Sequence, residues 1–136
     1  MIVIDSSVWV SWLVSQDVHH QPSRQWMADT LASGQTLVIP SLALAEIAGA
    51  VARRTGQATQ GKQSVRQLLR LPALRVEPVD RLLAMTAASV AADLKLRGPD
   101  AIFAALAYRL DISLVTWDNE LAQRASRLIT TLPPGG

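Results

Sequence analysis

The stretch Met1-Ile2-Val3-Ile4-Asp5-Ser6-Ser7 decides the fold, because a short apolar run ends there in an acid and two hydroxyl side chains. An uninterrupted apolar run of this length is typical of a strand buried on both faces, so Met1–Asp5 is predicted as such a strand. Ser6 or Ser7 is expected to cap a helix that continues through Leu13. The chain is therefore expected to open with a strand that leads directly into a helix.

The same alternation of strand and helix continues along the chain. Further strands are expected at residues 36–39, 74–77, 112–116 and 128–132. Further helices are expected at residues 22–32, 40–52, 60–71, 80–96, 100–110 and 118–127, with Asp80 as one N-cap and Gly34, Gly56 and Pro72 as stop signals. This alternation predicts an α/β fold in which a mainly parallel sheet of four to five strands is flanked by helices.

Length and composition favour one soluble globular domain. The chain has 136 residues, of which 49% are hydrophobic and 18% charged, and this balance argues against disorder. Residues 1–132 are expected to form the domain, and 133–136 a flexible tail. There is no cysteine, which excludes disulfides and thiolate metal sites. The N-terminus lacks the pattern of a signal peptide. The least charged stretch, Leu37–Ala52, is shorter than the about 20 residues that cross a bilayer. A cytoplasmic protein without membrane contact is therefore expected.

Charge is unevenly distributed although the net charge is only +2. No acid lies between Glu46 and Glu77, while this interval holds Arg53, Arg54, Lys62, Arg66, Arg70 and Arg75. A block of one sign is either a solvated helical face or the binding surface for a partner of opposite charge, such as a nucleic acid. Charge alone leaves both interpretations open.

Three aspartates lie where the predicted elements begin or end. Asp5 and Asp118 follow predicted strands, and the carboxyl ends of parallel strands are where such sheets place their functional crevice. Asp100 follows Pro99 at the start of a predicted helix. Taken singly, Asp5 and Asp118 are better explained as helix caps, and Asp100 can be explained as a partner of the helix dipole.

Glu46 is harder to explain as a surface residue. It is the only charged residue from Thr30 through Ala52, and its predicted helix is otherwise made of small and apolar side chains. A glutamate on such a helix is expected to be at least partly buried, and burial raises the pKa of a carboxyl unless a cation is bound. A narrow polar stripe that faces water is the alternative explanation.

Considered together, the four acids suggest a metal site. Carboxylate oxygens favour Mg²⁺ or Mn²⁺, and no histidine or cysteine is spaced for zinc. Divalent cations would remove the repulsion among converging carboxylates. They would also lower the pKa of a bound water and stabilise the leaving oxygen of a phosphodiester, which is nuclease chemistry.

Four segments also resemble motifs of a known family. They are Ile2-Val3-Ile4-Asp5-Ser6-Ser7, Pro40-Ser41-Leu42-Ala43-Leu44-Ala45-Glu46-Ile47, Leu96-Arg97-Gly98-Pro99-Asp100-Ala101-Ile102-Phe103-Ala104-Ala105-Leu106-Ala107 and Leu114-Val115-Thr116-Trp117-Asp118. In this order they resemble the PIN-domain ribonucleases and, within them, the VapC-like toxins of type II toxin–antitoxin pairs of the VapBC type. The resemblance covers nearly the whole chain.

The resemblance implies an Mg²⁺- or Mn²⁺-dependent endoribonuclease with a cognate antitoxin and frequent homodimers. It carries over Asp5, Glu46, Asp100 and Asp118 as metal ligands, with Ser6 and Thr116 as hydrogen-bond donors that orient carboxylates or water. Candidate RNA contacts, chosen for charge or a stacking ring, are Arg53, Arg54, Arg97 and Trp117. Trp9, Trp12 and Trp26 are expected to pack in the core or at a dimer interface, and His19 and His20 to lie in a solvated loop.

Two other functions compete with this hypothesis. One is a phosphatase or phosphotransferase in which Asp5 is the nucleophile, but Ser7 stands where such sites usually carry a second acid. The other is a catalytically weak domain of the same fold that only binds RNA or a protein. Loss of one or more acids would indicate it, and all four acids are present.

Overall fold

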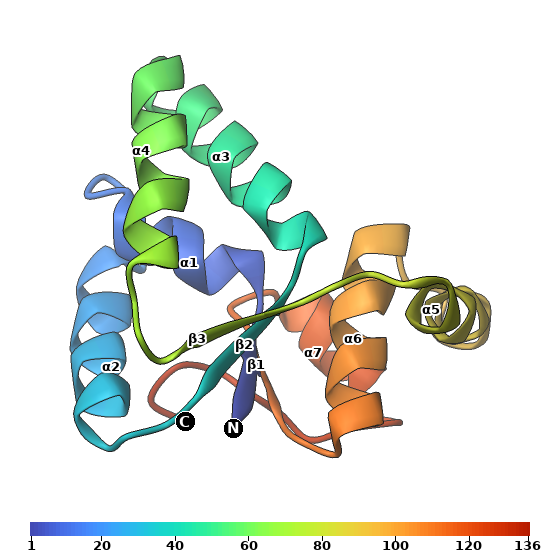
Figure 1. Cartoon of the computed structure of the whole chain (residues 1–136). Helices are drawn as coiled ribbons and strands as arrows, with labels where there is room; N and C mark the ends of the chain where they lie inside the picture. The colour runs from blue at the N-terminus through green and yellow to red at the C-terminus, as the bar shows by residue number, and fades with distance from the viewer.

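A computed structural model describes all residues, 1–136, and shows a sheet in which every pair of neighbouring strands is parallel. The strands are β1 (Ile2–Ile4), β2 (Leu37–Pro40), β3 (Leu74–Glu77), β4 (Leu114–Val115) and β5 (Thr131–Leu132). Their spatial order is β3-β2-β1-β4-β5, so β1 lies at the centre (Figure 1). The predicted α/β architecture is confirmed.

Seven helices cover the sheet. They are α1 (Ser6–Leu13), α2 (His20–Ala32), α3 (Leu42–Thr55), α4 (Ala58–Leu69), α5 (Arg81–Leu94), α6 (Gly98–Leu110) and α7 (Asn119–Ala125). Figure 1 places α1 to α4 on one side of β1 and β2, and α5 and α6 on the other. None of the helices combines the length and the apolar character that a membrane span needs.

The core is built from the two central strands and the helices packed on them. Val3, Ile4, Val38 and Ile39 are fully buried, as the unbroken apolar runs predict for a sheet covered on both faces. Trp9 and Phe103 are the largest buried side chains, and the ring of Trp9 meets that of Trp12 edge-on at a centroid distance of 5.8 Å. The expected core packing of these tryptophans is confirmed.

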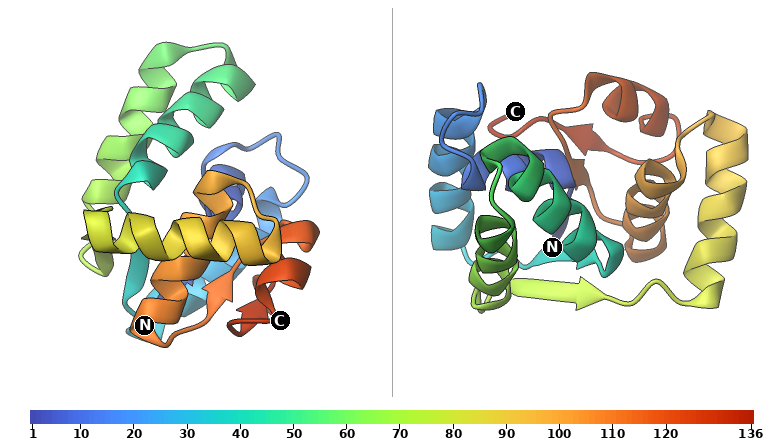
Figure 2. Two further views of the ribbon diagram at one scale, coloured as in Figure 1. Left: turned by 90° about the vertical axis from the view of Figure 1, so that its right-hand side faces the viewer. Right: turned by 90° about the horizontal axis from the view of Figure 1, so that it is seen from above.

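Helices α3 and α4 form a hairpin that rises away from the sheet (Figure 2, left). Gly56 ends α3 in the left-handed conformation with φ of 72°, as its place in the sequence predicts. Gly61 lets the two helices approach closely, because a Cβ at this position would collide with the carbonyl oxygen of Ala48. The basic segment between Glu46 and Glu77 therefore lies largely on a projecting hairpin.

Several predicted boundaries differ from those observed. The serines do not cap α1: Asp5 holds the N-cap position, and no side chain bonds the first turn. Helix α6 begins at Gly98 rather than at Asp100, because Pro99 is accommodated within a first helical turn. The last two strands are shorter than predicted, with two residues each. In the C-terminal segment 133–136, Pro134 is buried.

Candidate functional site

Asp5 lies at the end of β1, in the centre of the sheet, and only 6% of it is exposed. Its Oδ2 accepts hydrogen bonds from Ser7 Oγ at 2.7 Å and from Thr116 Oγ1 at 2.8 Å. Burial raises the pKa of the Asp5 carboxyl above its ordinary value of 3.8, and the two hydroxyl bonds offset part of that rise. A buried carboxyl is thus held in place by neutral donors, with no cation bonded to it.

Glu46 projects from α3 toward the same region and is half-buried. Ser6 Oγ donates to Glu46 Oε1 at 3.0 Å, which joins the start of α1 to α3. Burial is the main cause that raises the pKa of Glu46, and the charges of Asp5 and Asp100 raise it further. The sequence-based expectations of partial burial and a raised pKa are both confirmed.

Asp100 lies in the first turn of α6 and faces the cluster from the other side of the sheet. Burial raises its pKa, and so does the charge of Asp5 and, less strongly, that of Asp118. Arg97 Nε lies 3.5 Å from Asp100 Oδ2 and opposes this rise, but the Arg97 side chain is 82% exposed. The structure therefore brings the three acids close enough that Asp5 raises the pKa of both Glu46 and Asp100, and Asp100 raises that of Glu46.

Asp118 combines two roles. Its Oδ1 caps α7 by accepting hydrogen bonds from the backbone N–H groups of Glu120 at 3.0 Å and Leu121 at 3.1 Å. Its charge also acts on Asp100. The helix-cap interpretation and the cluster interpretation considered from the sequence are thus compatible.

Hydroxyl groups connect the acids to one another. Thr116 Oγ1 donates to Asp5 and accepts from the backbone N–H of Asp118 at 3.0 Å. Ser7 Oγ donates to Asp5 and accepts from the backbone N–H of Trp117 at 3.1 Å. Sequence reasoning missed the part played by Ser7; its position two residues after Asp5 was the available signal.

The cluster has the donor chemistry of a hard divalent cation, although its geometry is open. No three acidic or histidine side chains lie close enough together to hold a metal ion as they stand. Three carboxyl groups with raised pKa values nevertheless share this end of the sheet, and the one basic side chain paired with them is mostly exposed. A divalent cation would relieve both the burial cost and the mutual repulsion.

Two cavities open on the cluster. One, of about 620 Å³, reaches Ser6, Ser7 and Glu46 and is also lined by Asp17, His19, Arg53, Arg54 and Trp117. A smaller one, of about 250 Å³, reaches Asp100 and Asp118 beside Arg97 and Arg124. A larger cavity of about 730 Å³, lined by Tyr108 and Arg127 among others, contains none of the four acids.

Both histidines differ from their predicted solvated state. His20 begins α2, and its Nδ1 lies 2.8 Å from the carbonyl oxygen of Ser11. The His19 ring stacks on the indole of Trp117 with a centroid distance of 4.1 Å and an interplanar angle of 6°. The prediction was wrong because the sheet topology brings Trp117, almost a hundred residues away in the chain, against this loop.

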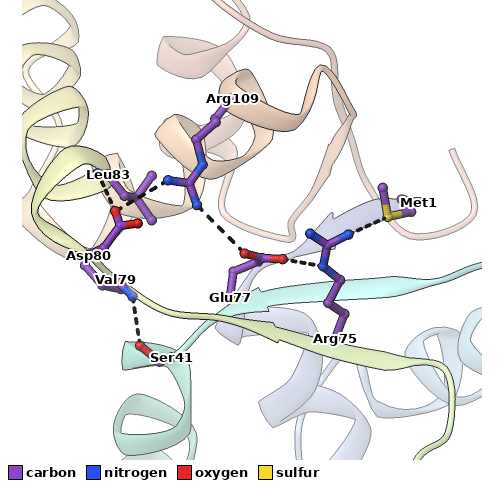
Figure 3. Close-up of polar contacts among 8 residues, drawn as sticks. All are labelled: Met1, Ser41, Arg75, Glu77, Val79, Asp80, Leu83 and Arg109. Carbon is purple, nitrogen blue, oxygen red and sulfur yellow. Dashed lines mark hydrogen bonds and ion pairs between the residues drawn. The ribbon is translucent and has the colours of Figure 1, made fainter.

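A second group of acids lies at the β3 edge of the sheet (Figure 3). Glu77 forms an ion pair with Arg75 Nε and lies 3.8 Å from Arg109 Nη2. Asp80 caps α5 through the N–H of Leu83 at 2.8 Å and lies 3.5 Å from Arg109 Nη1. These carboxylates are therefore neutralised by arginines of the same chain.

Comparison with known proteins identifies the family and the fold of this chain. The PIN domain family model matches residues 2–127, and the chain therefore belongs to the PIN-domain family. A search of curated proteins by sequence gives no match.

Solved structures agree on the fold. VapC20 of Mycobacterium tuberculosis, described as a Sarcin-Ricin loop cleaving toxin, has a TM-score of 0.75 and 20% identity over 90% of this chain and 94% of that one. FitAcB of Neisseria gonorrhoeae has a TM-score of 0.75 and 19% identity over 99% of each chain. VapBC2 of Rickettsia felis, bound to a promoter DNA fragment, has a TM-score of 0.73 and 16% identity over 98% of each chain. At these identities the likeness shows a shared fold.

Proposed function

We propose that this PIN-domain protein is an endoribonuclease that depends on Mg²⁺ or Mn²⁺ and that Asp5, Glu46, Asp100 and Asp118 hold the metal. The observation that carries the proposal is that three of these carboxyls, those of Asp5, Glu46 and Asp100, share the carboxyl end of the sheet with raised pKa values and one exposed arginine beside them. Such an arrangement is costly to the free protein and is relieved by a divalent cation.

The protein's own residues would orient this centre. Ser7 and Thr116 fix one oxygen of Asp5, while Ser6 fixes one oxygen of Glu46, so both carboxylates are held in defined orientations. A bound divalent ion would supply an activated water and stabilise the leaving oxygen of a phosphodiester. Ser6 and Thr116 therefore act as positioning residues in this proposal.

The surroundings of the cluster suit a polyanion. Arg53 and Arg54 line the cavity beside Glu46, and Arg97 borders the cavity beside Asp100. Trp117 reaches the first of these cavities, although His19 already covers one face of its ring. Cations and flat rings around a metal-binding centre favour RNA over a small phosphorylated metabolite.

We further propose that the protein acts in the cytoplasm as the toxin of a VapBC-type pair and forms a homodimer. The fold shared with VapC20 and with the VapBC2 complex supports this role. The partner would be a cognate antitoxin that inhibits cleavage.

The test is RNA cleavage by the purified protein with Mn²⁺ or Mg²⁺ and with EDTA. Cleavage is expected only with the divalent ion, and Asp5→Asn should abolish it while the melting profile remains cooperative. Asp111→Asn is the matched control, because this exposed aspartate follows α6 at the end remote from the cluster. If Asp5→Asn cleaves as fast as Asp111→Asn, the assignment is wrong; RNA binding without any cleavage would instead indicate a binding module.

A further inference from the structure

The cavity beside Glu46 has an aromatic wall as well as an acidic edge. His19 and Trp117 both line it, and they form a nearly parallel stack with centroids 4.1 Å apart. Its volume of about 620 Å³ lies within the range of about 300–1,000 Å³ that is usual for pockets holding small organic groups. The cavity can therefore take a planar group of nucleobase size next to the proposed metal centre.

The indole of this wall is fixed from within the core. Trp117 Nε1 donates to Ser23 Oγ at 2.8 Å, and Ser23 Oγ lies 2.6 Å from Ser11 Oγ. Both serines are essentially fully buried, and Ser11 Oγ donates in turn to the carbonyl oxygen of Val8 at 2.8 Å. This chain of hydrogen bonds fixes the plane of the indole before any ligand arrives.

The backbone of His19 is also held in place. The backbone N–H of His19 donates to Asp17 Oδ1 at 2.8 Å, and Asp17 Oδ2 forms an ion pair with Arg54 Nη1 at 3.0 Å. The loop that carries His19 is thus attached to the end of α3. A preorganised ring loses little conformational freedom when a ligand packs against it.

Arg53 supplies a cation that no acid of the chain engages. Arg54 is paired with Asp17, whereas no ion pair or hydrogen bond involves the Arg53 guanidinium. Arg53 Nη1 lies over Gly49, within 3.2 Å of where a Cβ would stand, and Gly49 is one helical turn from Glu46. A free guanidinium therefore faces the same cavity as Glu46 and the aromatic stack.

We propose that this cavity binds one nucleotide next to the scissile phosphate, with its base against the His19–Trp117 stack and its phosphate at Arg53. The proposal rests on the ribonuclease function proposed above and adds to it a base-stacking residue, His19. Stacking on flat side chains combined with a cationic contact is how proteins bind unpaired nucleotides. A peptide of a protein partner would leave the free cation beside the planar stack unexplained.

The experiment separates binding from cleavage. Single-stranded oligoribonucleotides carry 2-aminopurine, or an abasic site, at either position flanking the cleaved bond. Binding of both oligonucleotides is measured in EDTA by fluorescence anisotropy of an end label, stacking is measured by 2-aminopurine quenching, and cleavage is measured separately with Mn²⁺. His19→Ala should weaken binding about tenfold and reduce the quenching of 2-aminopurine, with little effect on the abasic oligonucleotide. His19→Phe, which keeps a flat ring, should restore both binding and quenching.

Arg53 is tested with a matched arginine. Arg53→Gln should weaken binding of both oligonucleotides several-fold and reduce the salt dependence of Kd. Arg127→Gln should leave the Kd of both oligonucleotides and its salt dependence unchanged. Arg127 is an exposed arginine that lines the cavity containing none of the four acids.

The outcomes distinguish the two proposals. If wild type cleaves RNA but His19→Ala weakens the base-containing and abasic oligonucleotides equally, the nucleotide subsite is wrong and the ribonuclease stands. If wild type does not cleave RNA but His19 governs the quenching, the subsite stands and the ribonuclease proposal fails. If His19→Ala weakens only the binding of a partner protein, the cavity is a protein-docking site and the subsite proposal is overturned.

Discussion

Two groups of carboxylates lie at different places on this sheet, one beside the edge strand β3 and one at the end of the central strand β1, and their partners differ in kind. At the β3 edge, Glu77 and Asp80 share Arg109, and Glu77 also pairs with Arg75 (Figure 3). At the carboxyl end of β1, the buried Asp5 bonds only hydroxyl and backbone groups, and its charge acts on other acids. The first group is neutralised within the chain, whereas the second has only the exposed Arg97 paired with it, at Asp100.

The difference shows how to recognise a functional acid. An acid with arginine partners contributes to the fold through ion pairs and helix caps. A group of acids held by neutral donors destabilises the free protein, since burial and repulsion both disfavour the charged form. Such a cost is consistent with selection for function, because a metal ion offsets it.

The largest expected effect separates one glutamate of each group. Glu46→Gln should reduce metal-dependent RNA cleavage at least about 100-fold, because changes to mere supports of metal ligands already cost about 10–100-fold. Glu77→Gln should leave cleavage unchanged but lower the free energy of unfolding by at most about 1 kcal/mol, since the ion pairs of Glu77 with the partly exposed Arg75 and Arg109 are lost. Initial cleavage rates and urea unfolding measure the two effects. Equal rates for the two variants would remove the distinction between the groups.

Metal binding should also distinguish the two groups of acids, through its effect on the free energy of unfolding. Mn²⁺ at about 100 times its Kd should raise the free energy of unfolding of the wild type by about 2.7 kcal/mol, since only the folded protein assembles the site. With Mn²⁺, the free energy of unfolding of Glu77→Gln should rise by as much as that of the wild type. The free energy of unfolding of Glu46→Gln should rise by clearly less. Denaturant unfolding with and without Mn²⁺ is the measurement. Stabilisation of Glu46→Gln to the wild-type extent would place the ion elsewhere.

The sequence predicted most of the fold because local signals agree with the global arrangement. The buried run at β1 and the left-handed Gly56 after α3 are dictated by nearby residues. The ends of β4 and β5 were predicted less well, because each strand is only two residues long and adjoining apolar residues pack against the core outside the sheet. Alternating strands and helices then place Asp5 and Asp118 at one end of the sheet.

The candidate site was less accessible from sequence wherever distant residues decide it. Burial of Glu46 follows from its apolar helix, so it could be foreseen. The His19–Trp117 stack depends on Asp17 meeting Arg54 and on Ser23 meeting Trp117, contacts that no local pattern encodes. In the same way, only the position of Arg109 shows that Glu77 and Asp80 are neutralised while Asp5 is not.

The pH dependence of stability should also distinguish the groups. Asp5 has a folded-state pKa above its ordinary 3.8, so its favourable contribution is complete below about pH 4 and is lost as the pH rises through the folded value. In EDTA, the free energy of unfolding of wild type should therefore fall relative to Asp5→Asn as the pH rises from 4 to 7. Urea unfolding at several pH values checks this trend, and Mn²⁺ should reverse it near pH 7. A difference between the two proteins that is constant with pH would contradict it.

The smallest expected changes in the free energy of unfolding come from replacing two arginines that each lie beside an acid. Arg109→Gln should cost about 1 kcal/mol of unfolding free energy, since Arg109 joins Glu77 to Asp80 and its side chain is 30% exposed. Arg97→Gln should change stability by less than about 0.5 kcal/mol, because the Arg97 side chain is 82% exposed. Arg97→Gln should instead raise the pKa of Asp100 further, since Arg97 is the nearest cation to that carboxyl. NMR titration of the Asp100 side chain measures that change. An equal loss of stability in both variants would mean that Arg97 supports the fold as Arg109 does, and that the acids of the proposed metal centre are already partly neutralised by the chain itself.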